Sequence, residues 1–141
     1  MRFSWIRMCS SIESRGRCQF NQFAPRMDSG RGRLSAQILG EFFRTVTQKI
    51  PSPLSPGDAH GQIATLIRAF PALPITPLIV LEAARGVRDH RLNYWDAQVW
   101  ATARLNQIPL VLSEDFKDGL VLDGVRFVNP FARSFDPSTI G

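Results

Sequence analysis

Residues 94–116 decide the fold, and they read YWDAQVWATARLNQIPLVLSEDF. Their first half repeats apolar side chains at helical spacing, which predicts a helix from about Tyr94 to Asn106. The short apolar run Pro109–Leu112 then predicts a buried strand, and acidic residues follow it at once. A helix that leads into a buried strand is typical of an α/β domain.

The same alternation of helices and short apolar strands continues on both sides of this stretch. Ser55-Pro56 and Thr76-Pro77 each combine a good N-cap with a proline suited to the first helical position. Asp123-Gly124 predicts a turn before the last strand. The further predicted elements are helices over residues 38–50, 56–70 and 77–89, and strands over residues 73–75 and 125–128. This order predicts an α/β fold with a largely parallel sheet.

The composition suits one packed globular domain. The chain has 141 residues, of which 44% are hydrophobic, so it can bury an ordinary core. No stretch approaches the roughly 18 apolar residues of a membrane span, and the first residues do not resemble a signal peptide. Cys9 and Cys18 do not make a disulfide framework. We therefore expect a cytoplasmic protein without membrane contact.

Charge is distributed unevenly along the chain. Residues 1–33 hold seven arginines against Glu13 and Asp28, so this segment carries the whole net charge of +5. The basic excess is therefore not a property of the predicted domain, and it does not indicate an RNA-binding surface there. Because residues 1–33 also lack a helical or strand period, we expect an atypical, poorly ordered N-terminal segment.

Asp96 is the first candidate site residue. It shares the helix face of Val99 and Trp100, and a carboxylate directed towards a core is costly unless a cation or hydrogen-bond donors meet it. The alternative is that Asp96 interacts with the helix dipole near the N-terminus, which is a common use of aspartate. His60 and His90 have no partner at metal-ligand spacing, so we expect both at the surface.

Two further acids are candidates on positional grounds. Asp115 directly follows the strand Pro109–Leu112, where ligands of parallel sheets bind, although it could be a solvated loop acid. Glu41 borders the apolar stripe of the first predicted helix beside Phe42, where most glutamates are plain surface residues. Together with Asp96 these oxygens would suit Mg²⁺ or Mn²⁺, which could activate water against a phosphodiester.

Four stretches in order resemble the VapC-type toxin ribonucleases of the PIN-domain family. Residues 34–43 resemble the second strand and following helix of the family, with Glu41 as its second acid. Residues 90–97 resemble the central motif with Asp96 as the third acid, and residues 112–116 resemble the strand-end motif with Asp115 as the fourth acid and Ser113 as the adjacent hydroxyl. Residues 125–131 resemble the closing strand.

The resemblance implies a three-layer α/β/α fold, with a PIN-like domain over residues 34–131 and a C-terminal tail over residues 132–141. It implies a metal-dependent endoribonuclease in which Glu41, Asp96 and Asp115 hold Mg²⁺ or Mn²⁺. The implied partners are an RNA substrate, a VapB-like antitoxin and a second copy of the chain in a homodimer.

Residues 1–33 depart from the family pattern. PIN domains begin with a central strand that ends in an aspartate, and here that strand is absent or replaced. Residues 3–8 could form a surrogate strand, but they carry no carboxylate. We expect a replaced or out-of-frame N-terminus. An aspartate-bearing strand encoded upstream in another frame would confirm this, whereas an uninterrupted native start without one would contradict it.

The missing acid leaves two alternatives to an active nuclease. The chain could be a catalytically impaired remnant that binds an antitoxin or RNA without cleaving it. Phe42, Phe43 and Phe70 could accept an antitoxin segment in that case, although most of these aromatic residues fit a core better. The chain could also be a fragment that does not fold stably by itself, because neighbouring strands would lose backbone partners.

Overall fold

The fold was analysed in a computed structural model, which describes residues 3–5 and 32–136. Expectations about the other residues of segment 1–33, and about the last residues of the predicted tail, lie outside the described residues. The strands are β1 (Phe3–Trp5), β2 (Gly32–Ser35), β3 (Ala72–Leu73), β4 (Leu110–Leu112), β5 (Val121–Leu122) and β6 (Val125–Val128). The helices are α2 (Ala36–Gln48), α3 (Pro56–Ala69), α4 (Pro77–His90) and α5 (Tyr94–Leu105).

The strands form one sheet in the order β3-β2-β1-β4-β6-β5. Every neighbouring pair is parallel except β5 and β6, which are antiparallel, so the prediction of a largely parallel sheet is confirmed. β1 lies between β2 and β4, with Phe3 opposite both Gly32 and Leu110. A strand therefore occupies the central place of the sheet, and it is formed by residues 3–5.

The predicted caps define the starts of the helices. Ser55 accepts a hydrogen bond from the N–H of Asp58 at 3.1 Å, and Thr76 accepts one from Ile79 at 3.3 Å. Helix α2 begins two residues before the predicted start because Ser35 caps it in the same way, accepting from Ile38 at 3.3 Å. A side-chain oxygen at the N-cap satisfies a backbone donor that has no partner within the helix.

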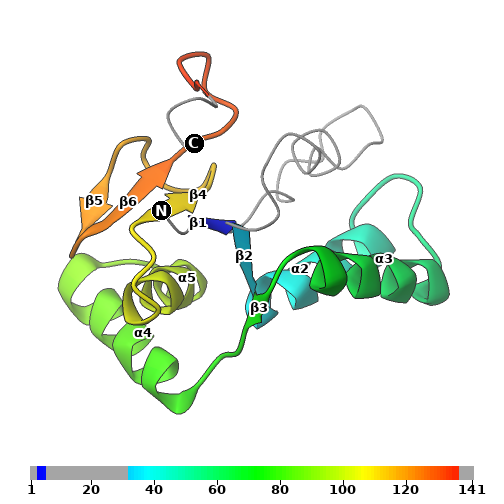
Figure 1. Ribbon diagram of the computed structural model, residues 1–141, viewed down its shortest axis with the longest axis horizontal. Helices are drawn as coiled ribbons and strands as arrows, with labels where there is room; N and C mark the ends of the chain where they lie inside the picture. Colours follow the sequence, from blue (N-terminus) through cyan, green and yellow to red (C-terminus); the bar gives the residue numbers. More distant parts are fainter. Residues whose placement is uncertain (1–2, 6–31, 137–141) are drawn as a thin grey trace.

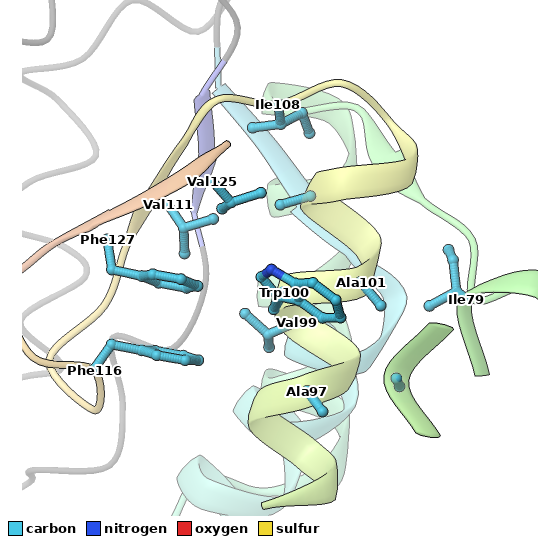
Figure 2. Packing of buried hydrophobic residues seen from close by; sticks show 12 residues of the cluster. Ile79, Ala97, Val99, Trp100, Ala101, Ile108, Val111, Phe116, Val125 and Phe127 are labelled. Carbon is cyan, nitrogen blue, oxygen red and sulfur yellow. The ribbon is translucent and has the colours of Figure 1, made fainter. Parts of the chain in front are cut away.

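Alternate side chains of β4 enter different cores. Val111 packs with α4 and α5, whereas Leu110 and Leu112 pack with residues of α2 and α3. Figure 1 shows α4 beside α5 and α2 beside α3. Figure 2 shows the first of these cores, where the rings of Phe116 and Phe127 stack with centroids 3.8 Å apart. Because successive side chains of a strand point to opposite faces of the sheet, β4 contributes to two hydrophobic clusters.

Trp100 is the centre of the packing between α4 and α5. Its ring is fully buried, and a Cβ atom on Gly86 would lie 2.8 Å from Trp100 Cζ3. The indole N–H donates to the carbonyl of Leu122 at 3.1 Å, which attaches the helix pair to the β5–β6 hairpin. The absence of a side chain at Gly86 therefore permits the close approach of the two helices.

Charged side chains cover the Trp100 ring on its outer side, with Arg85 and Arg104 5.0 and 5.9 Å from its centroid. Arg85 pairs with Glu82 at 2.7 Å and with Asp123 at 2.6 Å, and Arg104 pairs with Glu82 at 2.6 Å. His90 lies 3.2 Å from Asp123 and packs edge-on against Trp100. The expectation of a plain surface histidine is therefore wrong for His90, because the turn between β5 and β6 brings Asp123 to it.

Two of the three aromatic residues considered for antitoxin binding belong to the core. Phe42 and Phe70 are buried, at 7% and 4% exposure, and the half-buried Phe43 packs against the cluster of Phe42 and Val46. The core interpretation of Phe42 and Phe70 is confirmed. Within the described residues, no helix is long and apolar enough to cross a membrane.

Candidate functional site

Asp96 lies in the first turn of α5, on the buried side of the helix. Asn93 caps this helix, because its side-chain oxygen accepts from the Asp96 N–H at 3.1 Å. The Asn93 amide in turn donates to Asp96 Oδ2, so the two side chains hold each other. Asp96 is 9% exposed, in agreement with the prediction that its carboxylate faces the apolar side of the helix. The cap therefore fixes the carboxylate.

Glu41 is connected to the same helix end through Gln37. The Gln37 side-chain amide donates to Glu41 Oε1 at 2.9 Å and to the carbonyl of Trp95 at 3.1 Å. Residues four apart share a helix face, so Gln37 and Glu41 both point from α2 towards the start of α5. The hydrogen bonds of Gln37 thus connect Glu41 to the start of α5, one residue before Asp96, through a residue that the sequence analysis did not single out.

The oxygen of the Gln37 side chain has an unusual environment. Gln37 Oε1 is buried and has no hydrogen-bond partner among the residues that the structure describes. A buried acceptor without a partner costs about 1–3 kcal/mol, so such atoms often have a functional reason. Mg²⁺ and Mn²⁺ prefer oxygen ligands, and Mg²⁺ is usually held by one or two carboxylates together with water and substrate phosphates. The oxygens of Gln37, Glu41 and Asp96 fit such an ion by their chemistry.

Asp115 lies at the carboxyl end of β4, in the loop that the switch-point rule indicates. It is exposed, and its backbone N–H donates to the buried Ser113 hydroxyl at 3.2 Å. In the part of the chain that the structure describes, no group of three or more histidine, cysteine, aspartate or glutamate side chains could hold a metal ion. The structure therefore links Glu41 with Asp96 but does not bring Asp115 into a three-acid group with them.

The central strand contributes no acid to this edge of the sheet. β1 consists of Phe3, Ser4 and Trp5 and pairs with β4 up to Leu112, three residues before Asp115. A cavity of about 510 Å³ elsewhere is lined by Leu110, Arg126 and Phe135 among others, and by none of the three predicted acids. The candidate site is thus the region around the first turn of α5, with a donor set smaller than the family pattern implies.

Comparison with known proteins gives matches among solved structures. No protein-family model and no curated protein matches the chain. A chain of the DNA-bound VapBC complex from Salmonella typhimurium is 14% identical with a TM-score of 0.58, over 90% of this chain and 96% of that one. VapC20 of Mycobacterium tuberculosis, a sarcin-ricin loop cleaving toxin, is 15% identical with a TM-score of 0.61, over 89% and 99%.

At this level of identity the likeness is one of fold. The chain therefore has the mixed α/β fold of the VapC toxins, which is the PIN-domain fold that the motifs resemble. The match spans nearly the whole of both chains, so it is not confined to one helix-strand unit. Roles of individual residues do not follow from a fold, because unrelated functions share folds.

Proposed function

We propose that the chain is a metal-dependent endoribonuclease of the VapC toxin type, acting on RNA in the cytoplasm. The observation that supports this most is the hydrogen-bonded link from Glu41 through Gln37 to the first turn of α5, where Asp96 is buried. Glu41 on α2 is thereby connected to the helix end that carries Asp96, and a buried carboxylate calls for a cation or donors. The VapC fold supports the same reaction class.

Some residues would hold the metal ion in such a site, and others would orient those ligands. Glu41 and Asp96 would hold Mg²⁺ or Mn²⁺, with Asp115 approaching from the end of β4. Asn93 holds the Asp96 carboxylate in place, and Gln37 orients that of Glu41. When bound, the cation would polarise the scissile phosphate and lower the pKa of a water molecule. No side chain needs to act as a covalent nucleophile in this proposal.

Induced expression in a bacterial host tests the proposal in cells. We expect the parent chain to arrest growth and to create new 5′ ends in cellular RNA, and Asp96→Asn to do neither. Asp58→Asn is the matched control, because Asp58 lies in the first turn of another helix, α3, and accepts from its own N-cap residue. Equal RNA cleavage by parent and Asp96→Asn would contradict the role of Asp96.

A second candidate function is that of an impaired PIN-fold protein that binds an antitoxin without cleaving RNA. The carboxylate-free β1, together with the lack of a three-acid group in residues 3–5 and 32–136, favours it. The similar Salmonella chain comes from a VapBC complex. Co-purification with a VapB-like antitoxin, combined with no metal-dependent cleavage by the folded chain, would support this function over the first.

Homodimer formation is a further part of the proposal. Helix α4 exposes Leu78 and Leu81, at 67% and 68%, together with Val80 and Val87. Apolar side chains gathered on one exposed helix often mark a protein interface. Light scattering would test this, with a dimer expected for the parent chain and a monomer for Leu81→Asp. A monomeric parent would contradict it.

A further inference from the structure

Trp95 is the most exposed aromatic side chain beside the candidate site. It is 56% exposed, although the residues that follow it in α5, from Asp96 to Ala103, are all buried. Its ring packs edge-on against Tyr94, with centroids 5.3 Å apart. Its backbone is fixed by the Asn93 cap and by the hydrogen bond from Gln37 to its carbonyl. Trp95 is thus a large apolar surface on a rigid support.

Two exposed arginines lie on elements that adjoin Trp95, one at the end of α4 and one on α2, whose Gln37 donates to the Trp95 carbonyl. Arg91 lies four residues before Trp95 and ends α4 in a left-handed conformation, with φ of 56°. Arg44 lies on α2, one turn after Glu41 and on the same side of that helix. Both side chains are exposed, and neither has an ion-pair partner among the residues that the structure describes. Cations next to an exposed indole complement a ligand that combines phosphate with a flat ring.

We propose that Trp95 is a stacking platform for an unpaired base of single-stranded RNA, with Arg91 and Arg44 contacting the adjoining phosphates. This inference rests on the proposed ribonuclease function and names how its substrate is held. Base stacking on an aromatic side chain is a common means of binding single strands, and it tolerates different sequences because every base has a flat face. The platform directly precedes Asp96, so a base stacked on it places the neighbouring phosphodiester near the candidate acids.

Charge favours RNA over a protein partner at this position. The apolar surface of Trp95 is small, and exposed arginines lie on the adjoining elements, whereas the larger apolar surface lies on α4 around Leu78 and Leu81. A protein interface needs an extended apolar centre, and α4 supplies one. A single indole with exposed guanidinium groups on the adjoining elements suits one nucleotide better.

Fluorescence anisotropy with a short labelled single-stranded RNA, in EDTA, measures this binding without cleavage. Trp95→Ala is expected to weaken binding about 5- to 150-fold, which corresponds to the loss of one stacked base. Trp95→Phe is expected to restore most of the affinity because it keeps a ring. Ile67→Ala is the control, since it removes a similarly exposed apolar side chain, 50% exposed, from α3, and it should bind like the parent.

The outcomes separate this proposal from the ribonuclease function. RNA binding that is equal in the parent chain and Trp95→Ala would overturn the platform, even if the parent cleaves RNA. A parent chain that binds no single-stranded RNA would overturn it as well. Trp95-dependent binding by a chain that never cleaves would overturn the nuclease and leave the platform standing. Trp95→Ala that keeps RNA affinity but loses a dimer or an antitoxin would assign Trp95 to a protein interface instead.

Discussion

The close packing of α4 against α5 depends on the absence of a side chain at Gly86. Substitution by alanine would place a Cβ atom 2.8 Å from Trp100 Cζ3 and 2.9 Å from Cε3, in a fully buried and rigid ring. We expect Gly86→Ala to lower the free energy of unfolding by about 1–3 kcal/mol, because overpacking outweighs the gain in helix propensity.

Gly40→Ala is the matched control for this prediction. Gly40 is also helical, and a Cβ atom there would meet nothing within 4 Å. It should gain up to about 1 kcal/mol from helix propensity alone. Urea denaturation of the two variants compares them directly, and a stabilised Gly86→Ala would contradict the packing described for α4 and α5.

Gln37 is the residue whose role is easiest to separate from catalysis. Gln37→Leu removes the amide that orients Glu41 and the oxygen that has no hydrogen-bond partner within residues 3–5 and 32–136. Loss of a group that orients a metal ligand typically weakens metal affinity about 10- to 100-fold. We expect that loss in a Mn²⁺ titration followed by electron paramagnetic resonance. The exposed Gln48→Leu at the other end of α2 should bind Mn²⁺ like the parent, and equal affinity of both variants would contradict the role.

The burial of Asp96 could be predicted from the sequence, but the role of Gln37 could not. Burial of Asp96 followed from the apolar residues three and four positions later, because helical spacing determines which face a side chain occupies. Gln37 could not be recognised, because its importance comes from the carbonyl of Trp95, 58 residues away. Its spacing of four residues from Glu41 was the available indication.

At the scale of elements, the ion pairs around Trp100 connect α4, α5 and the β5–β6 turn. The hydrogen bond from Arg85 is the main cause that lowers the pKa of Glu82 below its ordinary value of 4.5. Hydrogen bonds from Arg85 and then His90 lower the pKa of Asp123 below 3.8. Carboxyl groups with lowered pKa values in the folded state stabilise it above their ordinary pKa values, and this stabilisation is lost as the pH falls through the lowered values.

We therefore expect the free energy of unfolding to decrease as the pH falls below about 4.5. Glu82→Gln should show a smaller decrease, because it removes one of the two carboxyl groups that take up a proton when the chain unfolds at low pH. Urea denaturation over a pH series measures both curves. Parallel curves for parent and Glu82→Gln would show that other carboxyl groups cause the acid sensitivity.

Long elements followed from the sequence better than short ones. The four helices and β6 agree with their predicted spans because caps, prolines and apolar periods coincide there. β5 was not predicted, since two residues carry no period and its pairing with β6 depends on the Asp123-Gly124 turn. The position of β1 in the sheet also depends on partners far along the chain.

At the scale of the whole molecule, β1 determines whether the sheet is continuous. Ser4 lies opposite both Arg33 and Val111, so its strand has neighbours on both sides. Ser4→Pro removes a backbone donor from the middle of the sheet and is expected to lower the free energy of unfolding by roughly 3 kcal/mol. Ser4→Thr keeps the donor and should be close to the parent. Equal stability of the two variants in urea would contradict the central place of β1.

The fold as a whole could be predicted from the sequence, although no protein-family model and no curated protein matches the chain. The chain has the fold of solved structures with which it shares only 14–15% of residues. Binary patterning tolerates extensive substitution, which explains why the fold persists. The place of Asp115 relative to Glu41 and Asp96 could not be predicted, because it depends on the loop after β4.

Cleavage of a mixed tRNA pool by the purified chain, with Mn²⁺ and with EDTA, tests the proposed activity most directly. We predict cleavage with Mn²⁺, none with EDTA, and none by a folded Asp96→Asn variant in either condition. Failure of a demonstrably folded parent chain to cleave with Mn²⁺, or equal cleavage by Asp96→Asn, would contradict the account.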